Sequence, residues 1–537
     1  MLATPTRPAP VVDTLADHRQ LIAALARALS GDAGPAGVRV LETHISSVLL
    51  TGIHAYKLKK PVALGFCDFT TLAARKFFCA QELRLNRRLA PSLYLAVVPI
   101  AGSLAAPIVG GTGEAIDYAV QMREFPQEAL LSRVLARGAL GPTDIDALAE
   151  EVARFHARID VAPAATPFGT PDRIALYARQ NFAQLDGVPG AARRRALSAL
   201  ALWTERELAA RAPAIRKRRQ DGFVRECHGD LHLGNIAQID GRSVIFDCIE
   251  FNDDLRYIDV MSEIAFTTMD LADRGRPDLA RRFLNAYLER TGDYPGLAVL
   301  RLYLVYRAMV RAKIAHVRAL QVAAEPSRAT LDAECRGYVV QARRYARRTR
   351  PLLVLMHGYS GSGKSTLAQS LQEAIDSVRI RTDAERKRMQ GLARDARTGS
   401  AVSRGLYSAA ATQQTYERVR ELAGNALDAG FSAIVDGTFL RRAQRDLLRA
   451  LAVDRHVPLV IVDVTADAGA VRERLAHRAL NANDPSEAGV EVLWHQLRTH
   501  EPLAPDEQRH VVTVASTRTL TAAEVARIRA AASIPAA

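Results

Sequence analysis

The chain has 537 residues, too many for one hydrophobic core, so two or three domains are expected. Its composition, 48% hydrophobic and 24% charged, is ordinary for a globular protein, and the absence of any apolar run near ~18 residues excludes a transmembrane helix. The net charge of +14 is compatible with a nucleic-acid partner. Because no basic stripe interleaved with aromatic residues accompanies it, we interpret it as an Arg-rich surface and expect neither nucleic acid nor membrane as a partner.

The five cysteines are an odd number without a C-x-x-C pair, so they indicate neither a disulfide framework nor a zinc site. Such cysteines fit a reducing cytosol. Residues 1–12 are Pro-rich and contain no apolar core, so they do not form a signal peptide. We therefore expect a cytoplasmic protein whose first twelve residues are a disordered tail.

The first third of the chain reads as a mostly β lobe with one long helix. Its pattern predicts, in order, an amphipathic helix at 15–30, strands between 38 and 63, a helix at 72–89, and strands at 94–100 and 118–122.

From residue 144 the pattern becomes mainly helical. The expected features are, in order, a helix capped by Thr143, a hairpin of strands 236–239 and 243–246 around Asp240-Gly241, a helical stretch at 297–347 broken at Pro326-Ser327, and an Arg-rich junction at 343–351.

After the junction, short apolar strands alternate with helices, a pattern that favours a parallel sheet with helices on both faces. The expected strands are 352–356, 378–381, 433–435 and 459–464. We therefore predict an α+β domain at 13–348 and an α/β domain at 349–537.

The first motif is HGDLHLGN at residues 228–235. Asp230 and Asn235 are five residues apart, the spacing of the base and the metal ligand in a kinase catalytic loop. One carboxylate must orient the acceptor hydroxyl while a nearby amide reaches the cation on the phosphates. Asp247, beyond the expected hairpin, would be the second metal ligand, and such oxygen ligands suit Mg²⁺.

This motif resembles the aminoglycoside phosphotransferase and choline kinase superfamily over roughly residues 35–330. The resemblance implies a bilobal protein-kinase-like fold and transfer of the ATP γ-phosphate to a small-molecule hydroxyl. It makes Asp230 the catalytic base, Asn235 and Asp247 the metal ligands, and His228 and His232 structural supports. The chain departs from kinases in lacking a G-x-G-x-x-G loop before its third strand.

The lysine that positions ATP has two candidates. Ala55-Tyr56-Lys57 resembles the A-x-K of kinases, but Lys59 lies on the same face of an alternating strand, so the pattern leaves both open. We favour Lys57, with Glu82 on the following helix as its ion-pair partner.

The second motif, GYSGSGKS at residues 358–365, is a complete Walker A loop between an expected strand and an expected helix. Its backbone N–H groups and the helix N-terminus would hold the phosphates of ATP. Lys364 would bridge the β- and γ-phosphates, and Ser365 would ligate Mg²⁺. The predicted nucleotide-binding residues are Gly358, Ser360, Gly361, Ser362, Gly363, Lys364, Ser365 and Thr366.

Asp383 follows the second expected strand of this domain. The arrangement resembles P-loop kinases of the polynucleotide kinase, zeta toxin and gluconate kinase type over roughly residues 350–515. That resemblance makes Asp383 the base and Arg386 a substrate contact, although Asp383 also suits a helix N-cap. Asp436, at the end of another strand, would hold Mg²⁺ through water.

Three arginines, Arg472, Arg474 and Arg478, are expected on one helix and resemble the lid arginines of such kinases, with Arg472 taken as catalytic. A solvated helix face is the alternative for each of them. Residues 483–486 would form the turn at the end of the lid.

The whole chain resembles bacterial fusions of an aminoglycoside phosphotransferase-like domain with an ATP-binding P-loop domain. We expect a bifunctional ATP-dependent kinase, each domain phosphorylating a small-molecule hydroxyl. Two alternatives remain: one domain binds ATP and regulates the other, or the P-loop domain phosphorylates nucleic-acid ends. The sequence identifies neither acceptor nor the oligomeric state.

Overall fold

The structure, a computed structural model, describes residues 11–31, 37–65, 67–322, 324–394, 396, 408–480, 489–516 and 519–532. The chain forms two compact units: residues 1–144, 155–173 and 219–267 make up the first, and residues 145–154, 174–218 and 268–537 the second. The domain boundaries expected from the sequence stay a prediction, and most of the predicted tail lies outside the described residues.

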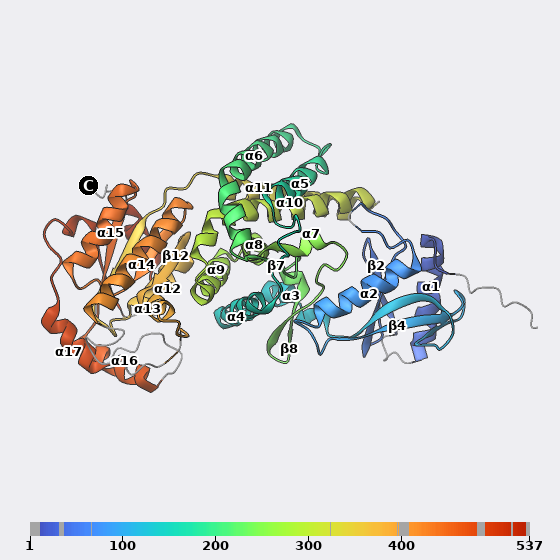
Figure 1. The fold of residues 1–537 in the computed structure, drawn as a ribbon, viewed down its shortest axis with the longest axis horizontal. Helices are drawn as coiled ribbons and strands as arrows, with labels where there is room; N and C mark the ends of the chain where they lie inside the picture. Colours follow the sequence, from blue (N-terminus) through green and yellow to red (C-terminus); the bar gives the residue numbers. More distant parts are fainter. Residues whose placement is uncertain are drawn as a thin grey trace, which may run out of the picture. The chain divides into compact units, whose positions relative to one another are not determined.

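A six-stranded antiparallel sheet organises the start of the first unit, in the order β1-β2-β3-β6-β4-β5 (Figure 1). The strands are β1 (Arg39–Glu42), β2 (Ser46–Leu50), β3 (His54–Lys59), β4 (Tyr94–Gly102), β5 (Pro107–Val109) and β6 (Ala115–Arg123). Leu49 packs in one core with α1 (Leu15–Ala28), and its neighbour Leu50 packs in another with α2 (Leu72–Asn86). Alternating side chains thus bury both faces of the sheet. The predicted β lobe with its long helix is confirmed.

The remainder of the first unit carries the first motif. Its elements are α3 (Leu131–Ala136), β7 (Val224–Glu226), β8 (Ile236–Ile239), β9 (Arg242–Ile245), α7 (Asp253–Arg256) and β10 (Tyr257–Asp259). The predicted β8–β9 hairpin is confirmed, with Asp240 and Gly241 both at positive φ in its turn.

Four helices have residues in both units: α4 (Pro142–Arg158), α5 (Pro171–Ala183), α6 (Ala191–Gln220) and α8 (Val260–Asp273). The prediction that Thr143 caps α4 is wrong. Gly141 is the N-cap, and Pro142 occupies the first turn, where its missing N–H costs nothing. Asp144 accepts a hydrogen bond from the N–H of Gly141 at 2.8 Å.

The second unit contains a fully parallel five-stranded sheet in the order β12-β13-β11-β14-β15, which confirms the predicted α/β fold (Figure 1). The strands are β11 (Leu353–His357), β12 (Ser377–Arg381), β13 (Ser432–Asp436), β14 (Leu459–Thr465) and β15 (Val511–Ala515). The sequence pattern missed β15, because this edge strand alternates between buried and exposed residues instead of forming a continuous apolar run.

Helices cover both faces of this sheet. Val354 and Met356 share a core with α12 (Lys364–Ala374) and α18 (Ala522–Ala531), while Leu353 and Leu355 point the other way and are equally buried. The other helices around the sheet are α13 (Thr382–Met389), α14 (Ala409–Asp428), α15 (Arg442–Asp454), α16 (Ala468–Leu480) and α17 (Val490–Thr499).

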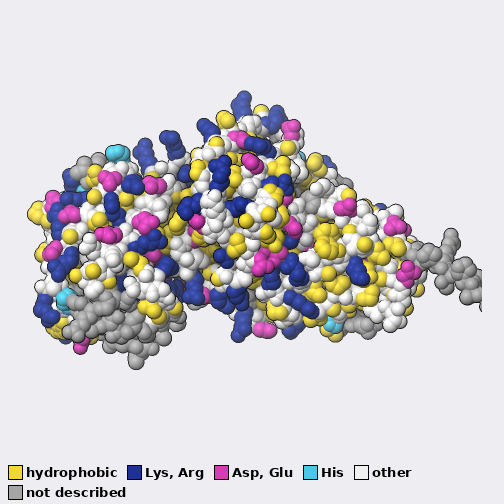
Figure 2. All heavy atoms as spheres, viewed as in Figure 1, with side chains coloured by type: hydrophobic (Ala, Val, Ile, Leu, Met, Phe, Trp, Pro, Cys, Tyr) yellow, Lys and Arg dark blue, Asp and Glu magenta, His cyan; other side chains and the backbone are white. Residues whose placement is uncertain are grey.

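Three more helices complete the second unit: α9 (Pro277–Thr291), α10 (Leu297–Gln321) and α11 (Glu325–Ala346). The long helical stretch does break, but the break lies before Pro326, which occupies the first turn of α11. Among the described residues, no helix combines the length and the apolar character that crossing a bilayer requires. On the face seen in Figure 2, Lys and Arg are interspersed with Asp and Glu.

Candidate functional sites

The loop that carries the first motif is held by its own side chains. The Nδ2 of Asn235 donates to the carbonyl oxygen of Asp230 at 3.0 Å and to its Oδ2 at 2.9 Å. The Nε2 of His228 lies 2.8 Å from the carbonyl oxygen of Phe246, and the Nδ1 of His232 accepts from the N–H of Gly234 at 3.0 Å. The two histidines therefore support the backbone, while the Asp230 side chain is 31% exposed.

Glu263 lies on α8 and contacts this loop, and the sequence analysis did not predict it as part of the site. Its carboxylate is fully buried and accepts from the N–H groups of His228, at 2.6 Å, and Gly229, at 2.8 Å. Burial alone would raise the pKa of Glu263, but bonds with His156 and His228 lower it, so the group is a carboxylate. A buried acid one helix away thus fixes the backbone just before Asp230.

The acidic residues that follow Asp247 are also used inside the fold. Asp253 pairs with Arg256, Asp254 pairs with Arg173, and Asp259 accepts from the N–H of Met261 at 2.8 Å. They therefore do not form a free acidic pocket of the kind that a polycationic ligand would require.

Asp247 lies directly after the hairpin, at a φ of 63° that is uncommon for a residue with a side chain. The N–H of Phe246 donates to the carbonyl oxygen of Asn235 at 3.0 Å, which places Asp247 beside the first motif. The Oδ1 of Asp247 lies 2.5 Å from the Nζ of Lys57, and its side chain is 42% exposed. The structure therefore brings together the predicted metal ligands and a lysine from β3.

Both candidate lysines contact Glu82, whose carboxylate oxygens lie 2.8 Å from the Nζ of Lys57 and 2.8 Å from that of Lys59. Lys59 is 1% exposed and also pairs with the buried Glu250. Burial opposes the charge of Lys57, but Asp247 and Glu82 raise its pKa well above the usual value. Lys57 therefore pairs with Asp247, one of the predicted metal ligands, whereas Lys59 is a core cation between two acids.

The turn between β2 and β3 stands where kinases carry their Gly-rich loop. Gly52 has a φ of 90°, and its N–H donates to the Oε2 of Glu124 at 2.6 Å. The turn therefore holds one glycine at positive φ, tied by its N–H to an acidic side chain, where the sequence lacks a G-x-G-x-x-G loop.

The Walker A loop joins β11 to α12, whose first residue is Lys364. Its glycines are required by geometry: a Cβ on Gly363 would lie 2.0 Å from the Oγ of Ser516, and one on Gly358 would lie 2.8 Å from the carbonyl oxygen of Val464. The N-terminus of α12 therefore opens directly on the loop, as an anion site needs.

Ser365 and Asp436 meet at the end of β13. The Oγ of Ser365 donates to the Oδ1 of Asp436 at 3.2 Å. Asp436 is 5% exposed, and among the described residues its buried Oδ2 has no hydrogen-bond donor, the nearest cation being the Nε of Arg381 at 3.6 Å. Lys364 donates to the carbonyl oxygen of Tyr359 at 2.5 Å. A hydroxyl, a carboxylate and an ammonium thus surround the loop.

Asp383 is the second residue of α13. The helix is capped by Arg381, so the alternative of Asp383 as an N-cap is wrong. The hydroxyl of Thr382 donates to the carbonyl oxygen of Asp436 at 3.2 Å, which places the start of α13 beside the Walker site. Arg386 lies one turn further along and is 8% exposed.

Of the predicted lid arginines, Arg474 lies beside the loop and Arg472 does not. Arg474 donates to the Oγ of Ser516 at 2.8 Å, and its Nη1 is 3.1 Å from where a Cβ on Gly363 would be. The guanidinium of Arg472 instead lies 5.8 Å from the ring centre of Trp494. The Arg478 side chain and the predicted turn at 483–486 lie outside the described residues.

Helix α17 contributes a residue that the sequence analysis missed. The Oε1 of Gln496 accepts from the N–H of Ser360 at 2.9 Å, and its Nε2 donates to the Oγ of the same serine at 2.9 Å. The hydroxyl of Tyr359 lies 3.1 Å from the Nδ1 of His500. The helix that follows the expected lid is therefore bonded to the Walker loop.

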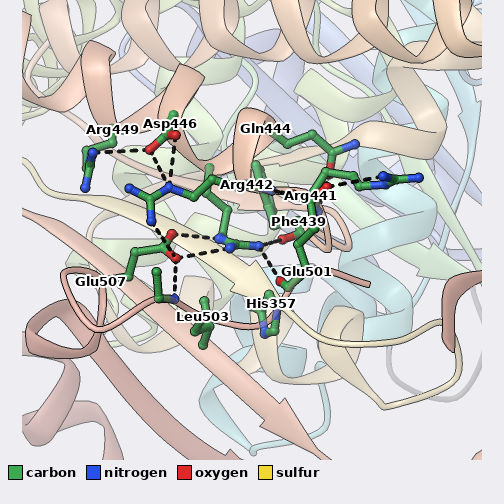
Figure 3. Close-up of polar contacts among 12 residues, drawn as sticks. His357, Phe439, Arg441, Arg442, Gln444, Asp446, Arg449, Glu501, Leu503 and Glu507 are labelled. Carbon is green, nitrogen blue, oxygen red and sulfur yellow. Dashed lines mark hydrogen bonds and ion pairs between the residues drawn. The ribbon is translucent and has the colours of Figure 1, made fainter. Parts of the chain in front are cut away.

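The segment that follows α17 in the chain is held to α15 by charged groups (Figure 3). Arg445 is 1% exposed and binds both oxygens of Glu507, at 2.7 and 3.0 Å. It also donates to the carbonyl oxygens of Phe439, at 3.0 Å, and Glu501, at 3.2 Å. Arg445 thus joins the segment after Asp436 to the segment after α17.

Two family models match the chain. The model described as "Phosphotransferase enzyme family" matches residues 75–303, and the model described as "AAA domain" matches residues 353–503. Over 452 residues the chain is 32% identical to an uncharacterized protein of Mycobacterium tuberculosis strain H37Rv, which spans 83% of this chain and 87% of that protein. An uncharacterized protein of Mycobacterium bovis matches to the same extent.

Solved structures with similar parts include a gluconokinase from Sinorhizobium meliloti 1021, at 23% identity over 35% of this chain and 92% of that chain, with a TM-score of 0.24. The aminoglycoside phosphotransferase APH(4)-Ia matches at 14% identity over 60% of this chain and 99% of that chain, with a TM-score of 0.36. Neither TM-score reaches 0.5.

Proposed function

We propose that the chain, which belongs to the same family as the uncharacterized mycobacterial proteins and matches both a phosphotransferase-family model and an AAA-domain model, is a bifunctional ATP-dependent kinase. Each domain would move the γ-phosphate of ATP to a hydroxyl of a small molecule. The observation that carries this proposal is the convergence of distant polar residues on each motif. Lys57 meets Asp247 at one site, and Ser365 meets Asp436 at the other.

At the first site, Asp230 would accept the proton of the acceptor hydroxyl as its oxygen attacks the γ-phosphorus and ADP leaves. Lys57, held by Glu82, would bind the phosphates. Asn235 and Asp247 fit Mg²⁺, because the Asn235 nitrogen faces Asp230, which leaves the amide oxygen for a cation, and Asp247 offers a partly exposed carboxylate. Mg²⁺ would neutralise charge on the phosphates when bound.

At the second site, the backbone of the Walker loop and Lys364 would hold the phosphates, and Asp383 would accept the proton of the acceptor. Ser365 and Asp436 fit Mg²⁺, since the buried Oδ2 of Asp436 has no donor among the described residues. Arg474 is better placed than Arg472 to neutralise charge at this loop.

The acceptor of each domain would be a small molecule with a free hydroxyl group. A sugar, an amino alcohol or a nucleoside carries such a hydroxyl. The internal pairing of Asp253 and Asp254 gives no support to a polycationic aminoglycoside in particular. A regulatory role for one ATP site, and phosphorylation of nucleic-acid ends, are the competing outcomes of the test.

The test measures ADP formation with a panel of sugars, amino alcohols, nucleosides and a 5′-hydroxyl oligonucleotide. Wild type, Asp230→Ala and Lys364→Ala are compared, and each variant is the control for the other site. We expect acceptor-dependent turnover, with each product lost in one variant only. ATP binding without acceptor-dependent turnover in the wild type would contradict the proposal and favour a regulatory role, and turnover on the oligonucleotide alone would favour end phosphorylation.

A further inference from the structure

Helix α9 closes the open edge of the parallel sheet. Strand β12 is the first strand in the sheet order, so among the residues that the structure describes one of its edges has no strand partner. Asn285 of α9 fills that edge: its Oδ1 accepts from the N–H of Arg379 at 2.6 Å, and its Nδ2 donates to the carbonyl oxygen of Ser377 at 3.2 Å. The side-chain amide thus replaces the backbone of a missing neighbour strand. All of these residues belong to the second unit.

One turn further along α9, Glu289 faces a group of arginines. Its Oε2 lies 3.2 Å from Arg379, and its Oε1 lies 3.4 Å from Arg381 and 3.3 Å from Arg394. Glu289 is 4% exposed. Burial alone would raise the pKa of Glu289, but the three guanidinium groups lower it to about 2. Glu289 is therefore a buried carboxylate that balances three cations.

Two of these arginines contact the Walker site directly. The Nη1 of Arg379 donates to the carbonyl oxygen of Ser365 at 3.2 Å. The Nε of Arg381 lies 3.6 Å from the Oδ2 of Asp436. Arg381 is therefore shared by two carboxylates, Glu289 on one side and Asp436 on the other.

We propose that Glu289 is a positioning residue of the P-loop site, which keeps Arg381 from closing on Asp436 and so leaves that carboxylate available to Mg²⁺. The proposal rests on the proposed binding of MgATP at this site. Glu289 lies outside the AAA match at 353–503 and inside the phosphotransferase match at 75–303. The P-loop site thus depends on a residue from the part of the chain that carries the other kinase motif.

Removal of the Glu289 charge should weaken Mg²⁺ binding at the P-loop site and strengthen the binding of ATP without Mg²⁺. In Glu289→Gln the shape is kept, but Arg381 loses the Glu289 carboxylate that holds it on the side away from Asp436, so it moves toward Asp436 and draws that carboxylate away from the cation. Mutation of a residue that orients a metal ligand typically lowers metal affinity by about 10- to 100-fold. We therefore expect the Mg²⁺ concentration that ATP binding requires to rise about tenfold. ATP without Mg²⁺ is a stronger anion and meets a more positive site, so its binding should tighten.

The experiment measures ATP binding calorimetrically in the full-length protein, with EDTA and then over a range of Mg²⁺. A Lys57→Met background weakens ATP binding at the first site, and the binding lost when Lys364→Ala is added is the binding that belongs to the Walker loop. The matched control is Asp293→Asn, which breaks another buried pair, with Arg218, only four residues from Glu289. The rescue variant combines Glu289→Gln with Arg381→Met, which removes the competitor for Asp436.

The proposal is supported if Glu289→Gln raises the Mg²⁺ concentration that ATP binding requires and increases the affinity for ATP in EDTA. Asp293→Asn should change neither quantity. Adding Arg381→Met to Glu289→Gln should restore the wild-type Mg²⁺ requirement. An equal loss of affinity for ATP with and without Mg²⁺ would mean a merely structural role for Glu289 and would overturn the proposal. The same pattern in Asp293→Asn would overturn it as well. If Glu289→Gln does not fold, failure of Arg381→Met alone to lower the Mg²⁺ requirement overturns it instead. ATP binding that Lys364→Ala leaves unchanged would sink the proposed P-loop function itself, whereas Lys364-dependent binding that Glu289→Gln leaves unchanged would sink this proposal alone.

Discussion

The ammonium group of Lys57 lies 2.5 Å from the Oδ1 of Asp247, although the two residues are 190 positions apart in the chain. Lys59, only two positions from Lys57, pairs with Glu250 instead. Glu82 contacts both lysines, so one acid on α2 holds two cations that have different second partners. The two lysines should therefore respond differently to substitution.

Lys57→Met should leave the fold intact and remove activity at the first site. Glu82 keeps Lys59 as its partner, and Asp247 is 42% exposed, so no buried charge is left alone. Loss of one preorganised cation at the phosphates typically costs about 10²-fold in turnover. The measurements are turnover with the acceptor whose phosphorylation is lost in Asp230→Ala, and the melting temperature of Lys57→Met.

Lys59→Met should instead destabilise the first unit. The buried Glu250 would lose the ammonium group of Lys59, and breaking a buried pair by removing one member typically costs about 3–5 kcal/mol. Urea unfolding followed by circular dichroism measures the loss. A stable Lys59→Met that lacks activity, together with an active Lys57→Met, would reverse the two assignments.

Gln496→Leu should weaken ATP binding at the Walker loop. Gln496 makes two hydrogen bonds to Ser360, and each hydrogen bond contributes about 0.5–1.5 kcal/mol, so loss of both should raise the KM for ATP by about 5- to 150-fold. Gln508→Leu is the control, because Gln508 is exposed and bonds only outside the loop, to Leu503. Tighter ATP binding in Gln496→Leu would show that Gln496 competes with phosphate.

Arg445→Met should destabilise the second unit by about 3–5 kcal/mol, because it leaves Glu507 buried without its bidentate partner and strands the carbonyl oxygens of Phe439 and Glu501. Arg449→Met is the matched control on the same helix: it pairs with Asp446 and Asp506, whose side chains are exposed, and its removal should leave the melting temperature unchanged within error. Equal effects of the two substitutions in thermal unfolding would contradict this assignment.

His18 should make the stability of the first unit depend on pH. Burial lowers the pKa of His18 to about 4, and its Nε2 lies 2.9 Å from the Oγ of Ser47. Below the ordinary pKa of about 6.5 the unfolded chain binds a proton that the folded chain does not. The stabilisation is therefore complete above about pH 6.5 and is lost as the pH falls toward 4, by about 3 kcal/mol.

The measurement for His18 is urea unfolding of wild type and His18→Gln at several values between pH 7 and pH 4. The stability difference between them should shrink or reverse as the pH falls. A difference that stays constant over this range would show that the imidazole is not held neutral.

The sequence alone determined the two motif loops, because each is a short continuous segment whose chemistry depends on local spacing. Asp230 and Asn235 lie within one loop, and Lys364 and Ser365 begin one helix. The parallel sheet could also be predicted, since its strands are continuous apolar runs, whereas the alternating edge strand β15 carried too weak a signal.

Only the tertiary structure decided which charged side chains meet. Lys57 and Lys59 share a strand face, and their separate roles depend on Asp247 and Glu250, which arrive from about 190 residues away. Glu263 and Glu289 lie on helices without any recognisable motif, because a buried carboxylate is defined by the donors that surround it in space. Pairing between distant segments has no local pattern, and packing alone brings such partners together.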